Sequence, residues 1–232
     1  MVKERVTPNA AEAIAQSLRR RIVDEFADGD HIGSAEDLID HFKVSGPTLR
    51  QAMRVLEAEG LVKVRPGNNG GFFASTPSID VVSRSASAYL RRRGAEPADL
   101  IRMAQLIGPE VAERAANNPD VAARRMLVEH IKTAWADGMD ATIENAVNAA
   151  VGFARMMGDL SGSPSLALFS AVLSDLVMDL LVEVTRTVPS DVLNKYAREI
   201  RAGHKRLGRA IAKGDAQEAR RIQQQMNLIA EL

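Results

Sequence analysis

The sequence predicts a mostly α-helical protein in which a winged helix-turn-helix precedes an all-α bundle of six to seven helices. Two observations support this fold class. Between residues 29 and 75, two short amphipathic helices lie one turn apart, and a glycine-rich hairpin follows them. Beyond residue 77 the apolar residues keep a helical period, and no alternating strand pattern recurs.

The N-terminal module opens with two predicted helices. Apolar residues recur at every fourth position between residues 10 and 26, which predicts the first helix. Ser34 is a suitable N-cap for a second helix over residues 35–42. Acidic residues occupy the first turn of this second helix, where the helix dipole favours them.

A third helix and a wing complete this module. Pro47 suits the first position of a helix over residues 48–59, and Gly60 can close that helix as a left-handed cap. Residues 61–65 and 72–74 are predicted strands around a turn rich in glycine and asparagine. A module of this kind binds DNA with its third helix and contacts the backbone with its wing.

The rest of the chain is punctuated by prolines, glycines and helix caps, with Asp140, Ser190 and Asp215 as expected N-caps. The predicted helices span residues 79–92, 97–117, 119–137, 141–160, 163–187, 190–214 and 216 onward. We therefore expect a winged module over residues 1–76, a linker over 77–80 and a helical domain over 81–232.

The composition excludes several classes of protein. The chain is 46% hydrophobic and 26% charged, and it has no cysteine for a disulfide or a thiol nucleophile. It has neither an apolar run of the roughly 18 residues that a membrane helix needs nor a signal peptide, so we expect a cytoplasmic protein without a membrane partner. The carboxylates show no catalytic constellation, and Glu110 and Glu113 beside Arg114 indicate a surface ion pair. An enzyme is therefore not expected.

The net charge is zero, so the expectation of DNA binding depends on where the charges lie. Basic residues of the third helix, its turn and the wing predict a local basic face, with Lys3 and Arg5 as candidate phosphate contacts from an N-terminal arm. The candidate DNA-binding residues are Ser45, Gly46, Thr48, Arg50, Arg54, Arg65, Gly67, Asn68 and Asn69. The alternative is a module that serves only docking or dimerisation.

The residues of the winged module also resemble a known family. The motifs Leu38, Phe42-x-Val44-Ser45, Leu49-Arg50-x-Ala52, Leu56-x-x-x-Gly60-Leu61-Val62 and Arg65-x-Gly67 resemble the GntR-type bacterial transcription regulators. The all-α second part, whose last helix begins Gly214-Asp215-Ala216-x-x-Ala219, resembles the ligand-binding FCD-type domain of the FadR subfamily. The resemblance implies a homodimeric regulator, in the first instance a repressor, whose affinity for operator DNA changes when a metabolite enters the helical domain.

Two positions of the winged module depart from this family. An arginine that contacts a guanine in the family is replaced by Gly46, and a second arginine is replaced by Glu36. Because a bidentate arginine–guanine contact contributes about 1–3 kcal/mol to base discrimination, the usual operator of the family is not expected here.

The helical domain departs further. Most members of the subfamily hold a divalent metal, and the resemblance places the four ligands at Ala150, Ala154, His204 and Met226. A single histidine cannot hold a metal that needs three or four protein ligands, so no metal or cofactor is expected. The family's pocket motif, an acidic residue and an arginine, is replaced in this chain by Arg102 and Ala104.

What remains predicts an apolar pocket. The candidate effector-binding residues are Arg102, Ala150, Phe153, Ala154, Met157, His204 and Met226. This lining suits an alkyl chain, so the hypothesis is a hydrophobic effector such as a fatty acid or an acyl-CoA. In the alternatives, the methionines are core residues, His204 is a buried polar group satisfied by a neighbour, and the chain is a ligand-independent DNA-binding dimer. An open cavity would favour sensing over this last alternative.

Overall fold

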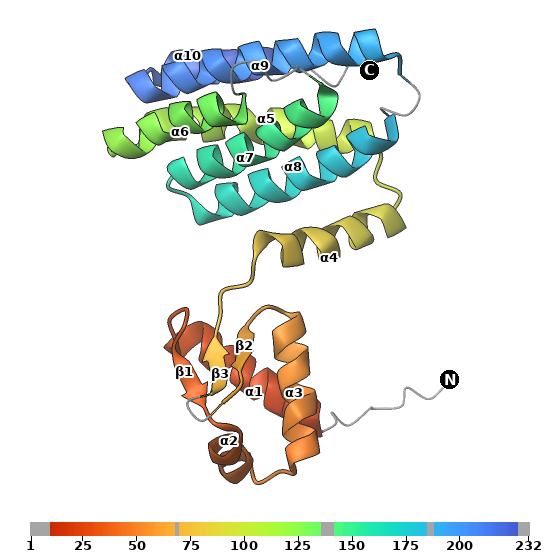
Figure 1. Cartoon of the computed structure of the whole chain (residues 1–232), viewed down its shortest axis with the longest axis vertical. Coiled ribbons are helices and arrows are strands. Elements are labelled where there is room, and N and C mark those ends of the chain that lie inside the picture. Colours follow the sequence, from red (N-terminus) through yellow and green to blue (C-terminus); the bar gives the residue numbers. More distant parts are fainter. Residues whose placement is uncertain (1–9, 68–69, 136–141, 185–187, 227–232) are drawn as a thin grey trace. The chain divides into compact units, whose positions relative to one another are not determined.

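The computed structural model describes residues 10–67, 70–135, 142–184 and 188–226 (Figure 1). The chain divides into two compact units, Met1–Val82 and Ser83–Leu232. The predicted fold class is confirmed, because a helix-turn-helix with a small sheet forms the first unit and helices form the second.

The first unit contains three helices and a three-stranded antiparallel sheet. The helices are α1 (Ala10–Glu25), α2 (Ala35–Phe42) and α3 (Gly46–Ala58). The strands are β1 (His31–Gly33), β2 (Val62–Arg65) and β3 (Gly71–Ala74), in the order β1-β3-β2. The sequence does not predict strand β1, because three residues are too few to display an alternating pattern.

A capping box begins α2, and a glycine follows the end of α3. The Ser34 hydroxyl accepts a hydrogen bond from the backbone N–H of Asp37, and the Asp37 carboxylate accepts one from the backbone N–H of Ser34. After α3, Gly60 adopts a φ of +75°, and a β-carbon there would lie 3.2 Å from Cα of Pro77. Because Gly60 has no side chain, the segment that follows β3 passes close to the end of α3.

The apolar faces of α1 and α3 form the core of this unit. Leu18, Leu49, Ala52 and Leu56 are completely buried. Since three of these residues occupy one face of α3, the opposite face of the helix is left exposed to solvent.

The second unit is a bundle of helices. They are α4 (Ile79–Arg92, whose first residues belong to the first unit), α5 (Pro97–Ala116), α6 (Val121–Ala134), α7 (Ile143–Leu160), α8 (Pro164–Val184), α9 (Ser190–Lys213) and α10 (Ala216–Gln225). Val111, Leu127, Trp135, Leu207 and Ile211 are among the most deeply buried residues of its core.

Two predicted caps of this bundle were wrong. Thr142 caps α7, where its hydroxyl accepts a hydrogen bond from the N–H of Asn145; the predicted cap, Asp140, lies outside the described residues. Ser190 is the first residue of α9 and not its cap, because Pro189 precedes the helix in that position. Asp215 does cap α10 by accepting a hydrogen bond from the N–H of Glu218.

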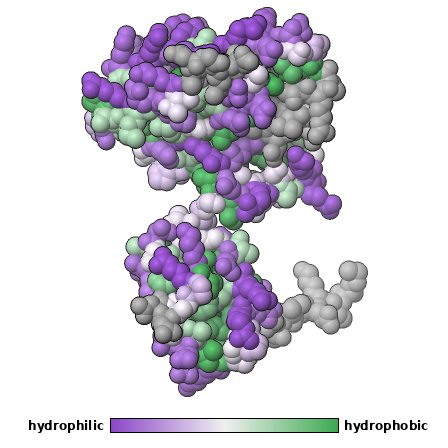
Figure 2. Space-filling model, viewed as in Figure 1, coloured by the Kyte–Doolittle hydropathy of each residue, from purple (hydrophilic) through white to green (hydrophobic). Residues whose placement is uncertain are grey.

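Hydrophilic side chains cover most of the face of the helical unit that Figure 2 shows. Within the described part of the chain, no helix combines the length and the apolar character needed to cross a membrane.

Candidate nucleic-acid interface and helical-domain cavity

The N-terminal end of α3 is polar, exposed and without an opposing acidic group. The Ser45 hydroxyl caps the helix by accepting a hydrogen bond from the N–H of Thr48 (3.4 Å), and the two hydroxyl oxygens lie 2.8 Å apart. The first turn of α3 contains no acidic residue. The positive end of the helix dipole is therefore open to an anion such as a DNA phosphate.

Two arginines extend this surface along α3. Arg50 and Arg54 are one turn apart and exposed, and neither forms an ion pair within the described ranges. A β-carbon on Gly46 would lie 3.2 Å from Nη1 of Arg50, so the Arg50 guanidinium lies beside the first turn of the helix. The charge of Arg50 therefore lies at the N-terminal end of α3, close to the backbone of Gly46.

Glu59, one of two acidic residues at the C-terminal end of α3, forms an ion pair with α1. Arg19 of α1 donates two hydrogen bonds to Glu59, from Nε at 2.8 Å and from Nη2 at 2.6 Å. The same ion pair raises the pKa of Arg19, chiefly through the hydrogen bond to the Glu59 carboxylate. Glu57, the other acidic residue at this end of α3, does not take part in this ion pair.

The wing presents a third arginine. The Arg65 guanidinium lies over the ring of Phe73 at 4.0 Å from the ring centroid, which holds the exposed side chain in one orientation. Gly67 adopts a φ of +107° at the turn. The predicted wing residues Asn68 and Asn69, and Lys3 and Arg5 of the arm, lie outside the described residues.

In the helical unit, α5, α7, α8, α9 and α10 surround a cavity of about 170 Å³. Six of the seven predicted effector residues line it: Ala150, Phe153, Ala154, Met157, His204 and Met226. Arg102 does not, because it is exposed on α5 and is not among the lining residues. The other lining residues are Ala104, Ile107, Gly108, Ser170, Leu173, Ser174, Val177 and Gln223.

His204 is the most unusual residue of this lining. It is 5% exposed, and its ring stacks on Phe153 with the centroids 4.4 Å apart. Burial, and to a lesser extent the nearby His130, lowers the pKa of His204 to about 4. Its Nδ1 is buried without a hydrogen-bond partner within the described residues.

Sequence reasoning missed the polar residues of the cavity. Ser170 and Ser174 lie one turn apart on α8, and Gln223 reaches the cavity from α10. A signal was present, because the two serines interrupt the apolar run of α8 at helical spacing. The run as a whole is typical of buried core, and this obscured the serines.

The donor set of the cavity does not fit a divalent metal. Among the described lining residues, His204 is the one imidazole or carboxylate, and Met226 supplies only a thioether. Across the described ranges, no three histidine or carboxylate side chains converge as metal ligands would.

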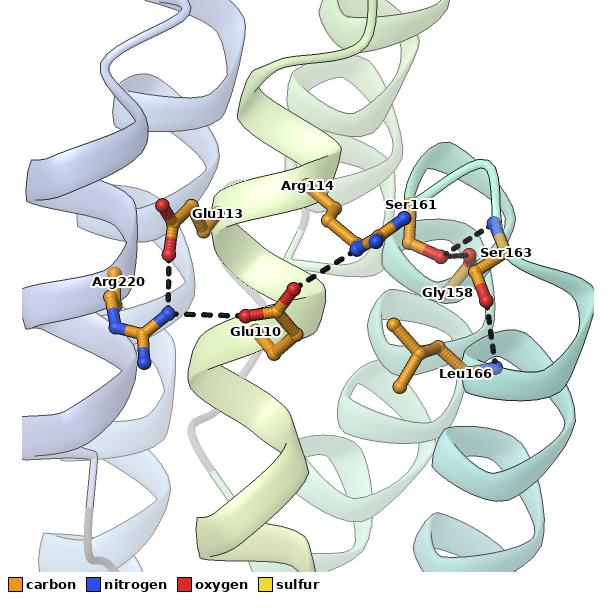
Figure 3. A network of polar contacts seen from close by, with 8 residues as sticks. All are labelled: Glu110, Glu113, Arg114, Gly158, Ser161, Ser163, Leu166 and Arg220. Carbon is orange, nitrogen blue, oxygen red and sulfur yellow. Dashed lines mark hydrogen bonds and ion pairs between the residues drawn. The ribbon is translucent and has the colours of Figure 1, made fainter.

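Two helices of the cavity wall are joined by ion pairs (Figure 3). The Glu110 carboxylate accepts hydrogen bonds from Arg114 at 3.0 Å and from Arg220 at 3.2 Å, and Arg220 also bonds to Glu113. The hydrogen bonds from Arg114 and Arg220 lower the pKa of Glu110. The predicted pairing of Arg114 with a neighbouring glutamate is thus part of a larger contact, in which Arg220 links α10 to α5.

A second polar contact joins α4, α7 and α8. The Asp175 carboxylate accepts a hydrogen bond from the Ser83 hydroxyl at 2.8 Å and bonds to Nη2 of Arg155 at 3.1 and 3.2 Å. Arg155 and Asp175 directly follow the lining residues Ala154 and Ser174. Ser83 of α4 is therefore linked to the helical turns of α7 and α8 that form the cavity wall.

Comparison with known proteins gives two matching families. Residues 10–72 match the family described as bacterial regulatory proteins, gntR family, and residues 99–227 match the FCD domain. The chain is 25% identical over 239 residues to the HTH-type transcriptional repressor NanR of Escherichia coli strain K12, covering 99% of this chain and 85% of that protein. The NanR repressor of Citrobacter rodentium is 25% identical over 236 residues, covering 99% of this chain and 86% of the relative.

A solved structure shares the fold. The structure of Streptococcus agalactiae GntR has a TM-score of 0.63 and a sequence identity of 19%, and the match covers 94% of this chain and 96% of that one.

Proposed function

Because the chain belongs to the gntR family of bacterial regulatory proteins and carries an FCD domain, we propose that it represses transcription by binding operator DNA through α3 and the wing. It is a DNA-binding transcription regulator, and its relatives are transcriptional repressors and not enzymes. Repression is proposed because both named relatives are described as repressors.

The observation that carries the DNA proposal is the N-terminal end of α3. The exposed hydroxyl-bearing cap, the two exposed arginines and the absence of acid in the first turn form an anion-binding surface on the helix that such modules insert into DNA. The proposed DNA-contacting residues are those predicted from the sequence: Ser45, Gly46, Thr48, Arg50 and Arg54 of α3 and its cap, and Arg65, Gly67, Asn68 and Asn69 of the wing.

The roles that we propose for the parts of the chain follow the predicted domains. Residues 1–76 bind DNA, residues 77–80 connect, and residues 81–232 bind an effector and hold two copies together as a homodimer. Each copy then places one α3 on one half-site of a pseudo-palindromic operator.

The DNA proposal is tested by replacing Arg50. An operator is first selected from genomic fragments by the wild-type protein, and its affinity is then measured by fluorescence anisotropy. Arg50→Ala is expected to weaken binding by about 5- to 150-fold, the range of one bidentate contact to a base. Arg125→Ala, which removes an exposed arginine of α6, is the matched control. Equal affinities of the two variants, or failure of the wild-type protein to select any fragment, would contradict the proposal.

The finer proposal is an apolar effector that binds in the cavity of the helical unit and changes operator affinity. The cavity supports sensing over the alternative of a purely dimerising bundle, since a filled core would leave no space for a ligand. For a fatty acid or an acyl-CoA, a volume of about 170 Å³ admits only a short acyl segment, as drug-sized sites are about 300–1,000 Å³.

The effector proposal is tested by mass spectrometry of the denatured, purified protein and by calorimetry with acyl compounds of increasing chain length. Binding that is strongest for short chains and fades with length is expected. Tight binding of a long acyl-CoA would contradict the size limit, and equal operator affinity with and without every bound compound would favour the dimerising alternative.

A further inference from the structure

We infer that the cavity of the helical unit takes a small, electrically neutral ligand whose polar end hydrogen-bonds to His204 and whose remainder is apolar. This inference rests on the proposed function, because it names the chemical class of the effector. Three independent properties of the cavity lead to it: the charge of its lining, the state of His204, and its size.

No charged side chain lines the cavity as far as the described residues define it. Its polar lining residues are His204, Ser170, Ser174 and Gln223, all uncharged groups. Three charged residues directly follow lining residues in sequence, Arg155, Asp175 and Lys205; none of them lines the cavity, and Arg155 and Asp175 pair with one another. A carboxylate or an ammonium entering this space would lose its hydration without gaining an opposite charge, which is strongly unfavourable.

His204 supplies a fixed and unsatisfied hydrogen-bonding group. Stacking on Phe153 fixes the plane of its ring, and Nδ1 has no partner within the described part of the chain. Because burial keeps the pKa of this ring at about 4, the imidazole is neutral at physiological pH and cannot compensate an anion. A neutral imidazole offers one donor and one acceptor, so it suits a hydroxyl or an amide. A ligand that pairs with it also removes the cost of a buried polar atom without a partner.

The remaining wall is apolar, and the space is small. Ala150, Ala154, Met157 and Met226 contribute only methyl, methylene and thioether groups. A volume of about 170 Å³ is close to that of an engineered apolar cavity of about 150 Å³ that binds benzene. The expected ligand is therefore of the size of one substituted ring or a short branched chain.

The test uses the full-length protein and three probes of nearly equal shape: toluene, benzyl alcohol and benzoate, each titrated by calorimetry at about pH 7.5, where the carboxylate is ionised and His204 is neutral. Benzyl alcohol is expected to bind about 3- to 10-fold more tightly than toluene, the effect of one neutral hydrogen bond. Benzoate is expected to bind at least about 100-fold more weakly than benzyl alcohol. Benzoate that binds as tightly as the alcohol would overturn the inference, and so would the absence of binding by all three probes.

Variants test whether the probes bind in this cavity and contact His204. His204→Phe is expected to abolish the preference for alcohol over toluene, whereas His204→Gln, which keeps a hydrogen-bonding group, is expected to retain it. Ala154→Leu fills the cavity and is expected to weaken all binding, whereas Ala202→Leu makes the same change at an exposed position of α9. A preference that survives in His204→Phe would overturn the role of His204.

A measurement on the wild-type protein covers the case in which a variant does not fold. In protein labelled with ¹⁵N-histidine, benzyl alcohol is expected to shift the imidazole resonances of the buried His204 and not those of the exposed His31 and His41. Shifts confined to the exposed histidines would contradict the inference.

The two proposals fail in different ways. If benzoate binds tightly and releases the protein from its operator, the chain is a ligand-controlled regulator but the neutral-ligand inference is wrong. If the wild-type protein selects no operator while the probe series behaves as expected, the neutral cavity stands and the proposed function fails.

Discussion

At the scale of single residues, two side chains define the two candidate sites. The Arg50 guanidinium lies beside the first turn of α3, where a β-carbon on Gly46 would be 3.2 Å from its Nη1. His204 is held in a desolvated position by Phe153, with one nitrogen unpaired within the described residues. Among the described residues, Arg50 has no ion-pair partner and Nδ1 of His204 has no hydrogen-bond partner, so each is available to a ligand.

The lowered pKa of His204 has a measurable consequence for stability. The unfolded chain takes up a proton near pH 6.5, whereas the folded domain accepts it only near pH 4. The free energy of unfolding therefore falls as the pH falls through this window, by about 1 kcal/mol between roughly pH 7 and pH 5.5 from this group alone. Urea unfolding of wild type and His204→Gln at both pH values measures it. The same loss in both proteins would show that His204 is not the source.

At the scale of elements, the periodic helices of the fold could be predicted from sequence, and the features that depend on distant contacts could not. The ranges of α5 and α8 follow from proline, glycine and the apolar period. The Arg19–Glu59 pair joins residues 40 positions apart, and no local pattern reports it. Strand β1 is set by its pairing with β3 rather than by its own three residues.

Of the cavity too, some lining residues could be predicted from sequence and others could not. The resemblance assigned His204, Ala150 and Met226 to one site, and these residues line one cavity of the helical unit; their role in binding an effector stays a prediction. The resemblance did not find Gln223, whose position depends on the close approach of α10 to Gly108 of α5; a β-carbon at that glycine would lie 3.0 Å from the Gln223 amide nitrogen.

The contact between α4 and α8 gives a prediction at this scale. Ser83→Ala removes the 2.8 Å hydrogen bond to Asp175 and leaves the Arg155–Asp175 pair in place. The free energy of unfolding is expected to fall by about 1 kcal/mol, the net contribution of one such bond. Ser85→Ala, at an exposed position of α4, is the control and is expected to change it by less than about 0.5 kcal/mol. Identical denaturation midpoints for the two variants would contradict the assigned bond.

At the scale of the whole molecule, a chain without net charge is assigned to DNA binding because exposed basic residues lie on α3 and the wing strand β2, namely Arg50, Arg54, Lys63 and Arg65. The affinity for DNA must then depend on few local contacts and not on a general positive field. The helical unit is not required to add charge to this surface. Its proposed role is to bind a neutral ligand and, through the dimer, to change the operator affinity of α3.

Salt dependence tests this distribution of charge. Lys63 is exposed on β2 and is expected to contact a phosphate. Lys63→Ala should weaken binding to operator and to unrelated duplex alike, and should reduce the slope of log K against log salt by about 0.9 per bound subunit. Lys195→Ala, at an exposed position of α9, is the matched control and is expected to leave the slope unchanged. An unchanged slope in Lys63→Ala would remove the wing from the interface.

The most direct measurement of operator binding by α3 is a hydroxyl-radical footprint of the full-length protein on an operator selected from genomic DNA. We predict two protected half-sites whose centres lie about one helical turn, roughly 10 base pairs, or a multiple of it apart, and the loss of both in Arg50→Ala. Uniform weak protection along the duplex, or a two-site footprint that Arg50→Ala leaves intact, would contradict the assignment of α3 as the helix that binds DNA.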